Sequence, residues 1–488
     1  MEQIVNWLNG IIWSQALIYL CLGVGLFYSL ATRFLQIRHM KDIFKLMFKG
    51  GKSEAGISSF QALNLALSGR VGTGNIAGVA TAIAFGGPGA VFWMWVMAFL
   101  GAGSAFIEST LGQVYKSKKD GQFRGGPAFY IEKGLKIKWY AILFAVVTVI
   151  STGLLLPGVQ ANSIAQGVES AFGISPSITG IVLVALLSFI IFGGVKRIAR
   201  VAEFVVPFMA LSYILVAIII IVLNISELPG ILKLIFSSAF GTDAAFGGIL
   251  GAAISWGVKR GIYSNEAGQG TGPHAAAAAE VSHPAKQGIV QAFSVYVDTL
   301  LVCSSTAFMI LITGMYNVTP EGKTKIVNNL ADIEPGPGYT QAAVESMFPG
   351  FGAPFVAISL LFFAFTTIMA YYYMAETNLA YINSKTNRVW TEYVLKVLIC
   401  VMTFYGSVKT ASLAWGLGDI GVGSMAWLNI IAILLLTKPT LKVLKDYESQ
   451  LKAGKDPVFE PAKLGIKNAD FWEKEYKYQN SNSDKKTG

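Results

Sequence analysis

Long apolar runs recur along the whole chain and limit its possible folds more than any other feature. A helix needs about 20 apolar residues to cross the hydrocarbon layer of a membrane, whereas a barrel strand needs only about 10. Runs of this length predict helices, whose backbone groups are satisfied within each segment. We therefore expect an all-α polytopic membrane protein. Its eleven transmembrane helices are predicted near residues 14–34, 60–85, 90–115, 139–165, 174–193, 202–223, 243–272, 286–315, 352–383, 389–408 and 412–436.

The composition excludes a soluble enzyme and a disordered scaffold. Hydrophobic residues make up 53% of the chain and charged residues only 14%, whereas soluble domains usually carry about 25% charged residues. The formal net charge of +10 is spread between the apolar runs and does not gather on one face, so we expect no nucleic-acid partner. The three cysteines and three histidines lack metal-ligand spacing.

The basic residues predict an orientation, because Lys and Arg collect on the cytoplasmic side of membrane proteins. With the N-terminus outside, 30 of the 38 Lys and Arg residues fall in segments expected inside, and the C-terminus is then cytoplasmic. The first run has no basic segment before it and is followed by Thr32-Arg33, which favours a retained span over a signal peptide. The polar tail from about residue 445 is predicted to be solvated, without a core of its own.

A glycine-rich stretch lies near the middle of the second run. Residues 68–78 contain four glycines together with Arg70 and Asn75, about 13 residues or roughly 20 Å into a helix that starts near Phe60. Glycine lowers helix propensity, and Thr and Asn side chains compete for backbone bonds, so a break is expected. Close helix packing through small residues is the alternative. Arg70 favours the break, because a charged group at this depth usually faces a cavity or a partner.

The seventh run contains a matching stretch, residues 255–273. Arg70 and Arg260 each precede an asparagine by five residues, and Ala-Gly follows two residues after each asparagine. Without the first run, the spans form two halves of five with opposite orientations, which is the pattern of inverted repeats around a binding site. We therefore divide the chain into an N-terminal helix with a basic loop (1–55), two five-helix repeats (56–223 and 224–440) and a C-terminal tail (441–488).

Interrupted helices favour a particular kind of ligand. Half-helix N-termini attract a carboxylate, and the carbonyls freed at a break attract a small cation. Such a site suits a zwitterionic amino acid carried with sodium.

At these stretches the sequence resembles the alanine/glycine:cation symporter family. Residues 86–101, which read GGPGAVFWMWVMAFLG, look like the signature of that family, and residues 72–75 and 264–268 look like its other characteristic stretches. The likeness spans about residues 56–440. It implies a LeuT-like fold, sodium- or proton-coupled uptake of alanine or glycine, and a bacterial or archaeal plasma membrane, with no obligate protein partner.

The resemblance also implies a substrate site. The pattern Val-Gly-x-Gly-Asn of the wider fold stands at residues 71–75, so the stretch Gly72, Thr73, Gly74 and Asn75 would bind the substrate. The backbone N–H groups of Thr73 and Gly74 would hold its carboxylate.

The same resemblance implies a sodium site built from two helices. Its ligands would be the carbonyls of Ser68 and Val71 and the hydroxyls of Thr366 and Thr367. Alternatively, both threonines bond back to their own helix, as intramembrane threonines commonly do. A second sodium site of the wider fold has no clear match at Asp298 in the eighth span, so the number of ions stays open.

The pocket wall in the seventh span has two possible registers. Trp256 lies about 13 residues into the predicted span, so Trp256 and Gly257 could wall the pocket and exclude larger side chains. The internal alignment instead places Tyr263 and Ser264 opposite residues 73 and 74. The length argument slightly favours the first register.

Other polar residues of the spans have less specific roles. Gln160 and Gln166 could bond the substrate amino group, although an ordinary interhelical hydrogen bond is an equal alternative. Arg70 is expected to pair with an acid. The candidate acids are Glu108, Glu266, Asp298 and Glu376.

Other functions fit the sequence less well. A channel usually needs a symmetric oligomer with a repeated filter motif. A membrane enzyme would need a nucleophile with its base or a metal cluster within the spans, and all three histidines lie between them. The chain lacks the phosphate-binding loop motif, so ATP is not expected to drive it.

Overall fold

The computed structural model describes residues 2–48, 56–119, 121–320, 324–331, 333–385, 388 and 390–476. The α-helices are α1 Glu2–Ile12, α2 Gln15–Ala31, α3 Leu35–Arg38, α4 Met40–Phe48, α5 Ser59–Arg70, α6 Val79–Gly86, α7 Gly89–Val114, α8 Pro127–Tyr130, α9 Lys138–Ile150, α10 Leu156–Phe172, α11 Pro176–Ile191, α12 Gly194–Leu223, α13 Leu228–Ala239, α14 Leu250–Asn265, α15 Gly272–Ala278, α16 Pro284–Tyr296, α17 Ser304–Thr313, α18 Pro337–Met347, α19 Gly352–Ile382, α20 Trp390–Ser407, α21 Ala411–Leu435 and α22 Thr437–Lys452. The 3-10 and π segments are η1 Gly74–Gly78, η2 Ile131–Leu135, η3 Ser151–Leu155, η4 Gly247–Ile249, η5 Val297–Cys303, η6 Asn383–Lys385, η7 Pro461–Leu464 and η8 Phe471–Glu475. Strands β1 Ser117–Lys119 and β2 Gln122–Arg124 form one antiparallel hairpin, and β3 Asn317–Val318 pairs with β4 Val327–Asn328.

The chain is an all-helical polytopic membrane protein. Six of the described helical segments are long and apolar enough to cross a membrane, and a seventh span results if the bent pair α1 and α2 is counted as one. The count of eleven therefore stays a prediction. Helices do occupy each of the eleven predicted runs, several of them as two segments joined at a break.

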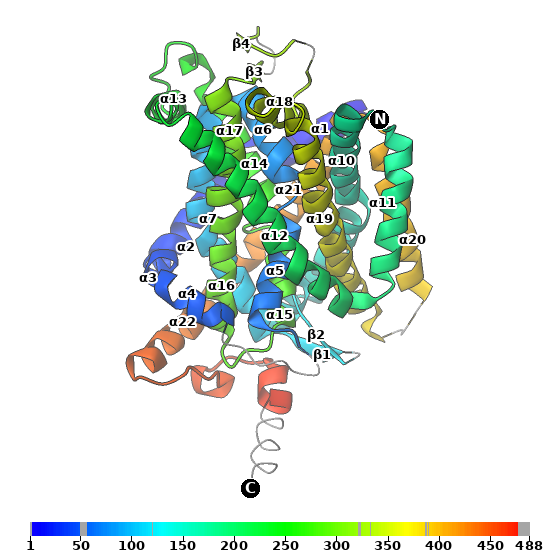
Figure 1. Cartoon of the computed structure of the whole chain (residues 1–488). Coiled ribbons are helices and arrows are strands. Elements are labelled where there is room, and N and C mark those ends of the chain that lie inside the picture. The colour runs from blue at the N-terminus through cyan, green and yellow to red at the C-terminus, as the bar shows by residue number, and fades with distance from the viewer. Residues whose placement is uncertain are drawn as a thin grey trace.

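The helices run side by side along the long axis of the molecule, and its two ends differ (Figure 1). The N-terminus, α13, α18 and the hairpin β3–β4 lie at one end, which we call the upper end. The helix α15, the hairpin β1–β2, α22 and the C-terminal segment lie at the other, the lower end.

The second predicted span is interrupted, as its glycine-rich stretch predicts. Helix α5 ends at Arg70, and Val71 has a ψ of 86°, outside the helical range. The chain then resumes through the π-helical η1 into α6. A capping box between Ser58 and Gln61 fixes the start of α5, with each side chain bonded to the other residue's backbone N–H.

The seventh predicted span is interrupted as well. Helix α14 ends at Asn265, and Glu266 adopts a left-handed conformation with a φ of 57°. Gly268 and Gly270 then have φ values of 81° and 89° before α15 begins at Gly272. Because glycine has no Cβ, it adopts these positive φ values without strain, so the glycine-rich sequence permits this turn.

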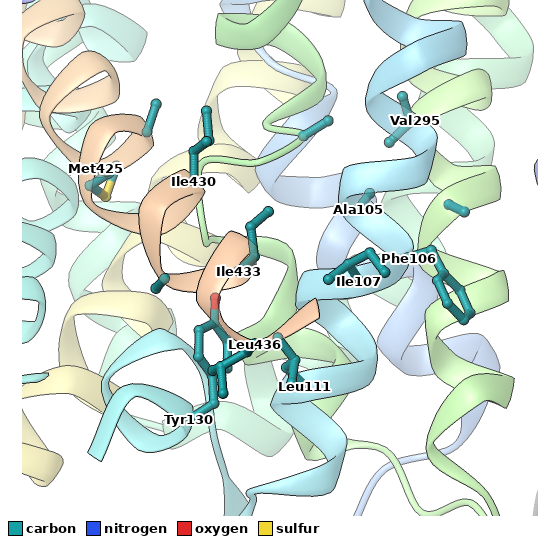
Figure 2. Packing of buried hydrophobic residues seen from close by; sticks show 14 of the residues in the cluster. Ala105, Phe106, Ile107, Leu111, Tyr130, Val295, Met425, Ile430, Ile433 and Leu436 are labelled. Carbon is teal, nitrogen blue, oxygen red and sulfur yellow. The ribbon is translucent and has the colours of Figure 1, made fainter. Parts of the chain in front are cut away.

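Helix α7 lies at the centre of the core. Its residues are buried without interruption from Gly101 to Val114. A Cβ added at Gly112 would lie only 2.8 Å from the carbonyl oxygen of Pro273, so small residues on α7 allow the interrupted seventh span to pack closely. Figure 2 shows part of this core, where Leu111 of α7 lies beside Leu436 at the end of α21.

The prediction of a solvated tail is wrong for residues 445–476, while residues 477–488 lie outside the described residues. The side chains of Tyr447, Phe459, Phe471 and Trp472 are each at most 2% exposed at the lower end of the molecule. The tail is polar on average, but its few aromatic side chains bury large apolar areas, which a composition count over the whole segment does not register.

The contact between α10 and α20 gives a test of the packing. A Cβ added at Gly406 would overlap the backbone of Gly158. We expect Gly406→Ala to lower the free energy of unfolding by about 1–3 kcal/mol, because the helices must move apart. Thermal unfolding in detergent measures this loss. Gly23→Ala in α2 is the control, because an added Cβ there has no neighbour within 4 Å. Equal melting temperatures for the two variants would contradict this packing.

Candidate functional site

The first break exposes backbone N–H groups that side chains bind. The N–H of Gly72 donates to Oδ1 of Asn75 at 2.8 Å, and the N–H of Thr73 donates to Oε1 of Gln160 at 3.0 Å. Thr73, Asn75 and Gln160 are all buried. Asn75 suits its place because its short amide reaches back to the backbone three residues earlier. A ligand carboxylate could replace the side-chain acceptor at Thr73.

The second break is held by a carboxylate from another helix. Glu108 of α7 accepts the N–H groups of Gly268 at 3.2 Å and Gly270 at 3.0 Å. Asn429 of α21 donates to the same carboxylate at 2.7 Å and to the carbonyl of Gly268 at 2.9 Å. The irregular backbone is therefore satisfied away from water. Sequence reasoning missed this role of Glu108 and Asn429, because no local motif connects residues so far apart in the chain.

The two breaks meet at a buried carboxylate. Asn75 Nδ2 donates to Asp298 Oδ1 at 2.6 Å, and Ser264 Oγ donates to Asp298 Oδ2 at 2.9 Å. Thr299 Oγ1 donates to the same oxygen at 2.7 Å. Asp298 is fully buried, and all of these donors are neutral groups. The available signal in the sequence was an isolated Asp within an apolar run.

The contact between the breaks decides the register of the seventh span. A Cβ added at Gly74 would lie 3.1 Å from the Cα of Ser264, as the internal alignment predicts. The length-based register is wrong, because α14 continues through Trp256 and Gly257. Helix α14 begins at Leu250 and not at residue 243, so the same distance of about 13 residues reaches position 263.

Trp256 and Gly257 therefore lie away from the breaks. The Trp256 ring packs against Phe85 with 4.7 Å between ring centroids. Gly257 faces α7, where an added Cβ would lie 2.5 Å from the carbonyl oxygen of Ala90.

The expected sodium ligands come together only in part. Thr367 Oγ1 lies 2.8 Å from the carbonyl oxygen of Ser68, 3.5 Å from that of Val71 and 3.0 Å from that of Phe363. The hydroxyl of Thr366 donates back to the same Phe363 carbonyl at 2.9 Å, so both threonines bond to their own helix, as the alternative predicts, but only Thr367 also lies beside the carbonyls of the first break. Three carbonyls and one hydroxyl thus converge beside the first break, and the Thr366 hydroxyl is turned toward its own helix.

The two glutamines of the fourth predicted span lie at different depths. Gln160 binds Thr73 and also lies beside the hydroxyls of Tyr263 and Tyr371. Gln166 lies farther along α10, where its Oε1 would be 3.9 Å from a Cβ added at Gly336. The structure therefore brings Gln160 to the breaks and leaves Gln166 outside this cluster.

Arg70 forms no ion pair with an acid among the described residues. Arg70 Nη1 donates to the carbonyl of Gln291 at 3.1 Å and to the hydroxyl of Ser294. Of the four candidate acids, Glu376 forms a bidentate pair with Arg124, with both contacts at 2.7 Å. The other three, Glu108, Glu266 and Asp298, accept hydrogen bonds from neutral groups, and all three attract the charge of Arg70 from a distance. Carbonyl and hydroxyl acceptors thus replace the expected acid.

A cavity of about 970 Å³ opens at the upper end, beside the N-terminal helix α1. Its lining includes the indoles of Trp13, Trp256 and Trp415 and the basic side chains of Lys259 and Arg260. Residues 72–75 are not part of the lining. Trp13 Nε1 donates to the carbonyl of Asp419 at 2.8 Å. This hydrogen bond attaches the turn between α1 and α2 to α21.

A buried ion cluster separates this cavity from the breaks. Asp419 Oδ1 lies 2.8 Å from Arg260 Nη1, and its Oδ2 lies 2.8 Å from Lys259 Nζ. The Arg260 guanidinium lies 4.4 Å from the centre of the Trp415 ring, a favourable cation–π distance. On the other side, Trp415 and Arg260 are the nearest neighbours of Gly78 in η1. The cluster therefore closes the upper side of the site.

The whole chain is similar to known membrane carriers. A family model described as "Sodium:alanine symporter family" matches residues 1–461. The YrbD protein of Bacillus subtilis (strain 168) is 67% identical over 98% of this chain and 99% of its own length. The sodium/proton-dependent alanine carrier protein of Bacillus sp. (strain PS3) is 58% identical, with coverages of 89% and 98%. The sodium/alanine symporter AgcS of Methanococcus maripaludis is 39% identical, with coverages of 89% and 94%.

Among solved structures, a manganese transporter of Eremococcus coleocola aligns with a TM-score of 0.51. The alignment covers 84% of this chain and 83% of that one at 12% sequence identity. At this identity the likeness concerns the fold alone.

The ion cluster at Asp419 gives a test of the site geometry. We expect Asp419→Asn to cost about 3–5 kcal/mol of stability, because the buried Arg260 and the half-buried Lys259 lose their shared carboxylate. Thermal unfolding in detergent measures this loss. Asp243→Asn is the control, because Asp243 lies in an exposed turn before α14 and joins no ion pair among the described residues. Equal effects of the two substitutions would contradict a structural role for the cluster.

Proposed function

Because the chain belongs to the sodium:alanine symporter family, we propose that it is a secondary transporter for small neutral amino acids, alanine or glycine, driven by sodium. The match over residues 1–461, which includes both interrupted helices, is the observation that carries this proposal. The family and the relatives are carriers and symporters, so the protein is a transporter and not an enzyme. Two relatives, those of Bacillus subtilis and Bacillus sp. (strain PS3), are named for protons as well as sodium, so proton coupling is the second candidate.

We propose a LeuT-like architecture for the membrane part. Eleven spans would comprise an extra N-terminal helix (1–55) and two inverted repeats of five (56–223 and 224–440), followed by the tail (441–488). Two features support it. The two interruptions fall at matching places in the two halves, and their freed segments contact each other at Gly74 and Ser264.

The proposed orientation places the upper end outside a bacterial or archaeal plasma membrane and the lower end in the cytoplasm. The basic segments 33–48, 116–119 and 437–476 all lie at the lower end, as the positive-inside rule requires. The cavity at the upper end would then be the external entrance for substrate.

The substrate carboxylate would bind at the first break. The N–H groups of residues 72–74 lie at the start of a half-helix, where the backbone dipole favours an anion. The carboxylate would displace Oε1 of Gln160 from the N–H of Thr73, and the freed amide oxygen of Gln160 would then accept from the substrate amino group. Gln166, Trp256 and Gly257, which were also predicted to bind substrate, would lie outside this carboxylate site.

Sodium would bind where the carbonyls of Ser68, Val71 and Phe363 converge on Thr367. Hard oxygen ligands from two helices can replace the water shell of a small cation. Thr366 would join the site only after its hydroxyl leaves the Phe363 carbonyl. Because the site joins α5 and α19, occupation would hold the first break in its substrate-binding shape.

Asp298 would bind a second positive charge, in addition to the sodium ion at Thr367, in each transport cycle. Among the described residues its buried carboxylate accepts hydrogen bonds from neutral donors, and the charge of Arg70 acts on it only from a distance. A buried carboxylate with no cation in contact is costly. The substrate ammonium, a second sodium ion or a proton would each remove this cost. This supports proton coupling as the alternative to sodium at this position.

Uptake into proteoliposomes tests the function. With sodium higher outside, we expect radiolabelled alanine to accumulate above its external concentration, and an equal potassium gradient should not drive it. A proton gradient imposed without sodium tests the second candidate. Thr73→Leu should abolish uptake, because the larger side chain would fill the break. The variant should still elute as one peak in size-exclusion chromatography, which shows that it is folded. Equilibration without accumulation would indicate a channel and contradict the proposal.

The two neighbouring threonines give a matched test of the sodium site. We expect Thr367→Ala to raise the sodium concentration for half-maximal alanine uptake by about tenfold, which corresponds to about 1.4 kcal/mol for one lost oxygen ligand. Thr366→Ala should change it less than threefold, because its hydroxyl points to its own helix. The sodium dependence of initial uptake rates distinguishes them. Equal shifts in both variants would remove the assignment of Thr367.

A further inference from the structure

The C-terminal segment 437–476 joins elements that are far apart in the chain. At the lower end, Trp472 Nε1 donates to the carbonyl of Gln113 at the end of α7 at 2.9 Å. The N–H of Phe459 donates to the carbonyl of Ser282, just before α16, at 2.9 Å. Asn468 Nδ2 also donates to a backbone carbonyl of η2 at 2.8 Å. The segment thus spans the lower face of the helix bundle (Figure 1).

An aromatic cage around one lysine lies at the centre of these contacts. Lys116 Nζ lies 4.4 Å from the ring centre of Phe123, 4.5 Å from that of Phe471 and 5.3 Å from that of Trp472. The same ammonium donates to the carbonyl of Ala279 at 3.0 Å. Burial lowers the pKa of Lys116 to about 7, while Glu280 acts in the opposite direction. Two of the three rings come from the C-terminal segment, so its departure would expose this lysine to water.

The cage lies where the lower ends of both interrupted spans meet. The N–H of Ile57, just before α5, donates to the carbonyl of Ala278 at 3.0 Å. The N–H of Glu280, just after α15, donates back to the carbonyl of Ile57 at 3.0 Å. Ala279, which Lys116 binds, lies between these two contacts. The C-terminal segment therefore packs on the joint between the two lower half-helices.

A second group of contacts fixes the loop that leads from α15 to α16. The His283 ring lies between Tyr447 and Phe459, with centroid distances of 5.3 Å and 5.6 Å. Lys286 Nζ forms an ion pair with Asp456 at 2.6 Å. These contacts attach the connection between α15 and α16 to the C-terminal segment. This connection would have to move together with the seventh span.

We propose that residues 437–476 form a clamp that holds the lower end of the transport path closed, and that the clamp must release before the path opens on that side. The inference rests on the proposed alternating access, because only a transporter needs its lower end to open. The clamp ties the joint of the two interrupted spans to α7 and η2. Separation of these elements would first have to break the cage and the ion pair.

Thiol labelling of Cys303 measures opening without any transport assay. Cys303 is 3% exposed and lies beside the breaks, 3.3 Å from Asn75 Nδ2 and 3.2 Å from Ser264 Oγ. With Cys21 and Cys400 replaced by serine, a membrane-impermeant maleimide reaches it only through an open path. Labelling is followed separately in inside-out and right-side-out vesicles, which expose opposite ends.

The double variant Phe471→Ala with Trp472→Ala should label about tenfold faster in inside-out vesicles, because it removes two buried aromatic side chains that hold the lower end closed. A tenfold change corresponds to about 1.4 kcal/mol in the free energy of opening. Labelling in right-side-out vesicles should not rise. Val458→Ala in the same segment is the control, since this side chain is 42% exposed. An equal rise in both kinds of vesicle would indicate general loosening and overturn the clamp.

A charge exchange gives a second test that keeps the aromatic core intact. Lys286→Glu and Asp456→Lys should each speed labelling from the lower side, and the two together should restore the slow rate. Limited proteolysis shows whether segment 437–476 has left the lower face in each variant. Unchanged labelling rates of Cys303 in variants whose segment is released would overturn the proposal. Alanine uptake is measured on the same preparations. Absent uptake by the unaltered protein would reject the proposed function, and faster labelling of the variants would then show only that the C-terminal segment closes the lower end. Normal uptake by the unaltered protein with unchanged labelling of the variants would reject only the clamp.

Discussion

The backbone hydrogen bond in a medium without water is the constraint on which this structure depends. Any break in a membrane helix frees N–H and C=O groups that cost several kcal/mol if left unbonded. At the first break, Asn75 and Gln160 bind two of these N–H groups, and at the second break Glu108 binds two more. These four freed donors each have a side-chain acceptor, which lowers the cost of the breaks.

The same need for hydrogen-bond acceptors supports the proposed ligand site at the first break. A side-chain acceptor such as Gln160 holds the N–H of Thr73 only while no better acceptor is present. A carboxylate is a stronger acceptor than an amide, because charge-assisted hydrogen bonds are about twice as strong as neutral ones. Glu108, by contrast, is bound by two backbone groups and by Asn429, so the second break is fixed. In the function that we propose, the first break would exchange its acceptor for the substrate, while the second break has a fixed structural acceptor.

Much of the fold could be predicted from the sequence, and the failures have physical causes. Hydrophobic length placed the helices, and the glycines with Asn75 located the first break. The length count misplaced the second break, because the turn before Leu250 is apolar enough to look like part of the span. The internal alignment succeeded there because it compares the two halves directly. Long-range partners such as Asn429 and the acceptors of Arg70 carry no local sequence signal.

The two ends of the molecule are closed by different chemistry, and this difference matters for alternating access. At the upper end a charged cluster of Asp419, Arg260 and Lys259 lines the large cavity. At the lower end an aromatic cage surrounds Lys116 on the joint between the interrupted spans. In the orientation that we propose, a zwitterion arriving through the cavity would meet charged groups with which its own ammonium and carboxylate can compete. The aromatic contacts at the lower end offer it no such competition, so they would stay intact while the upper contacts change.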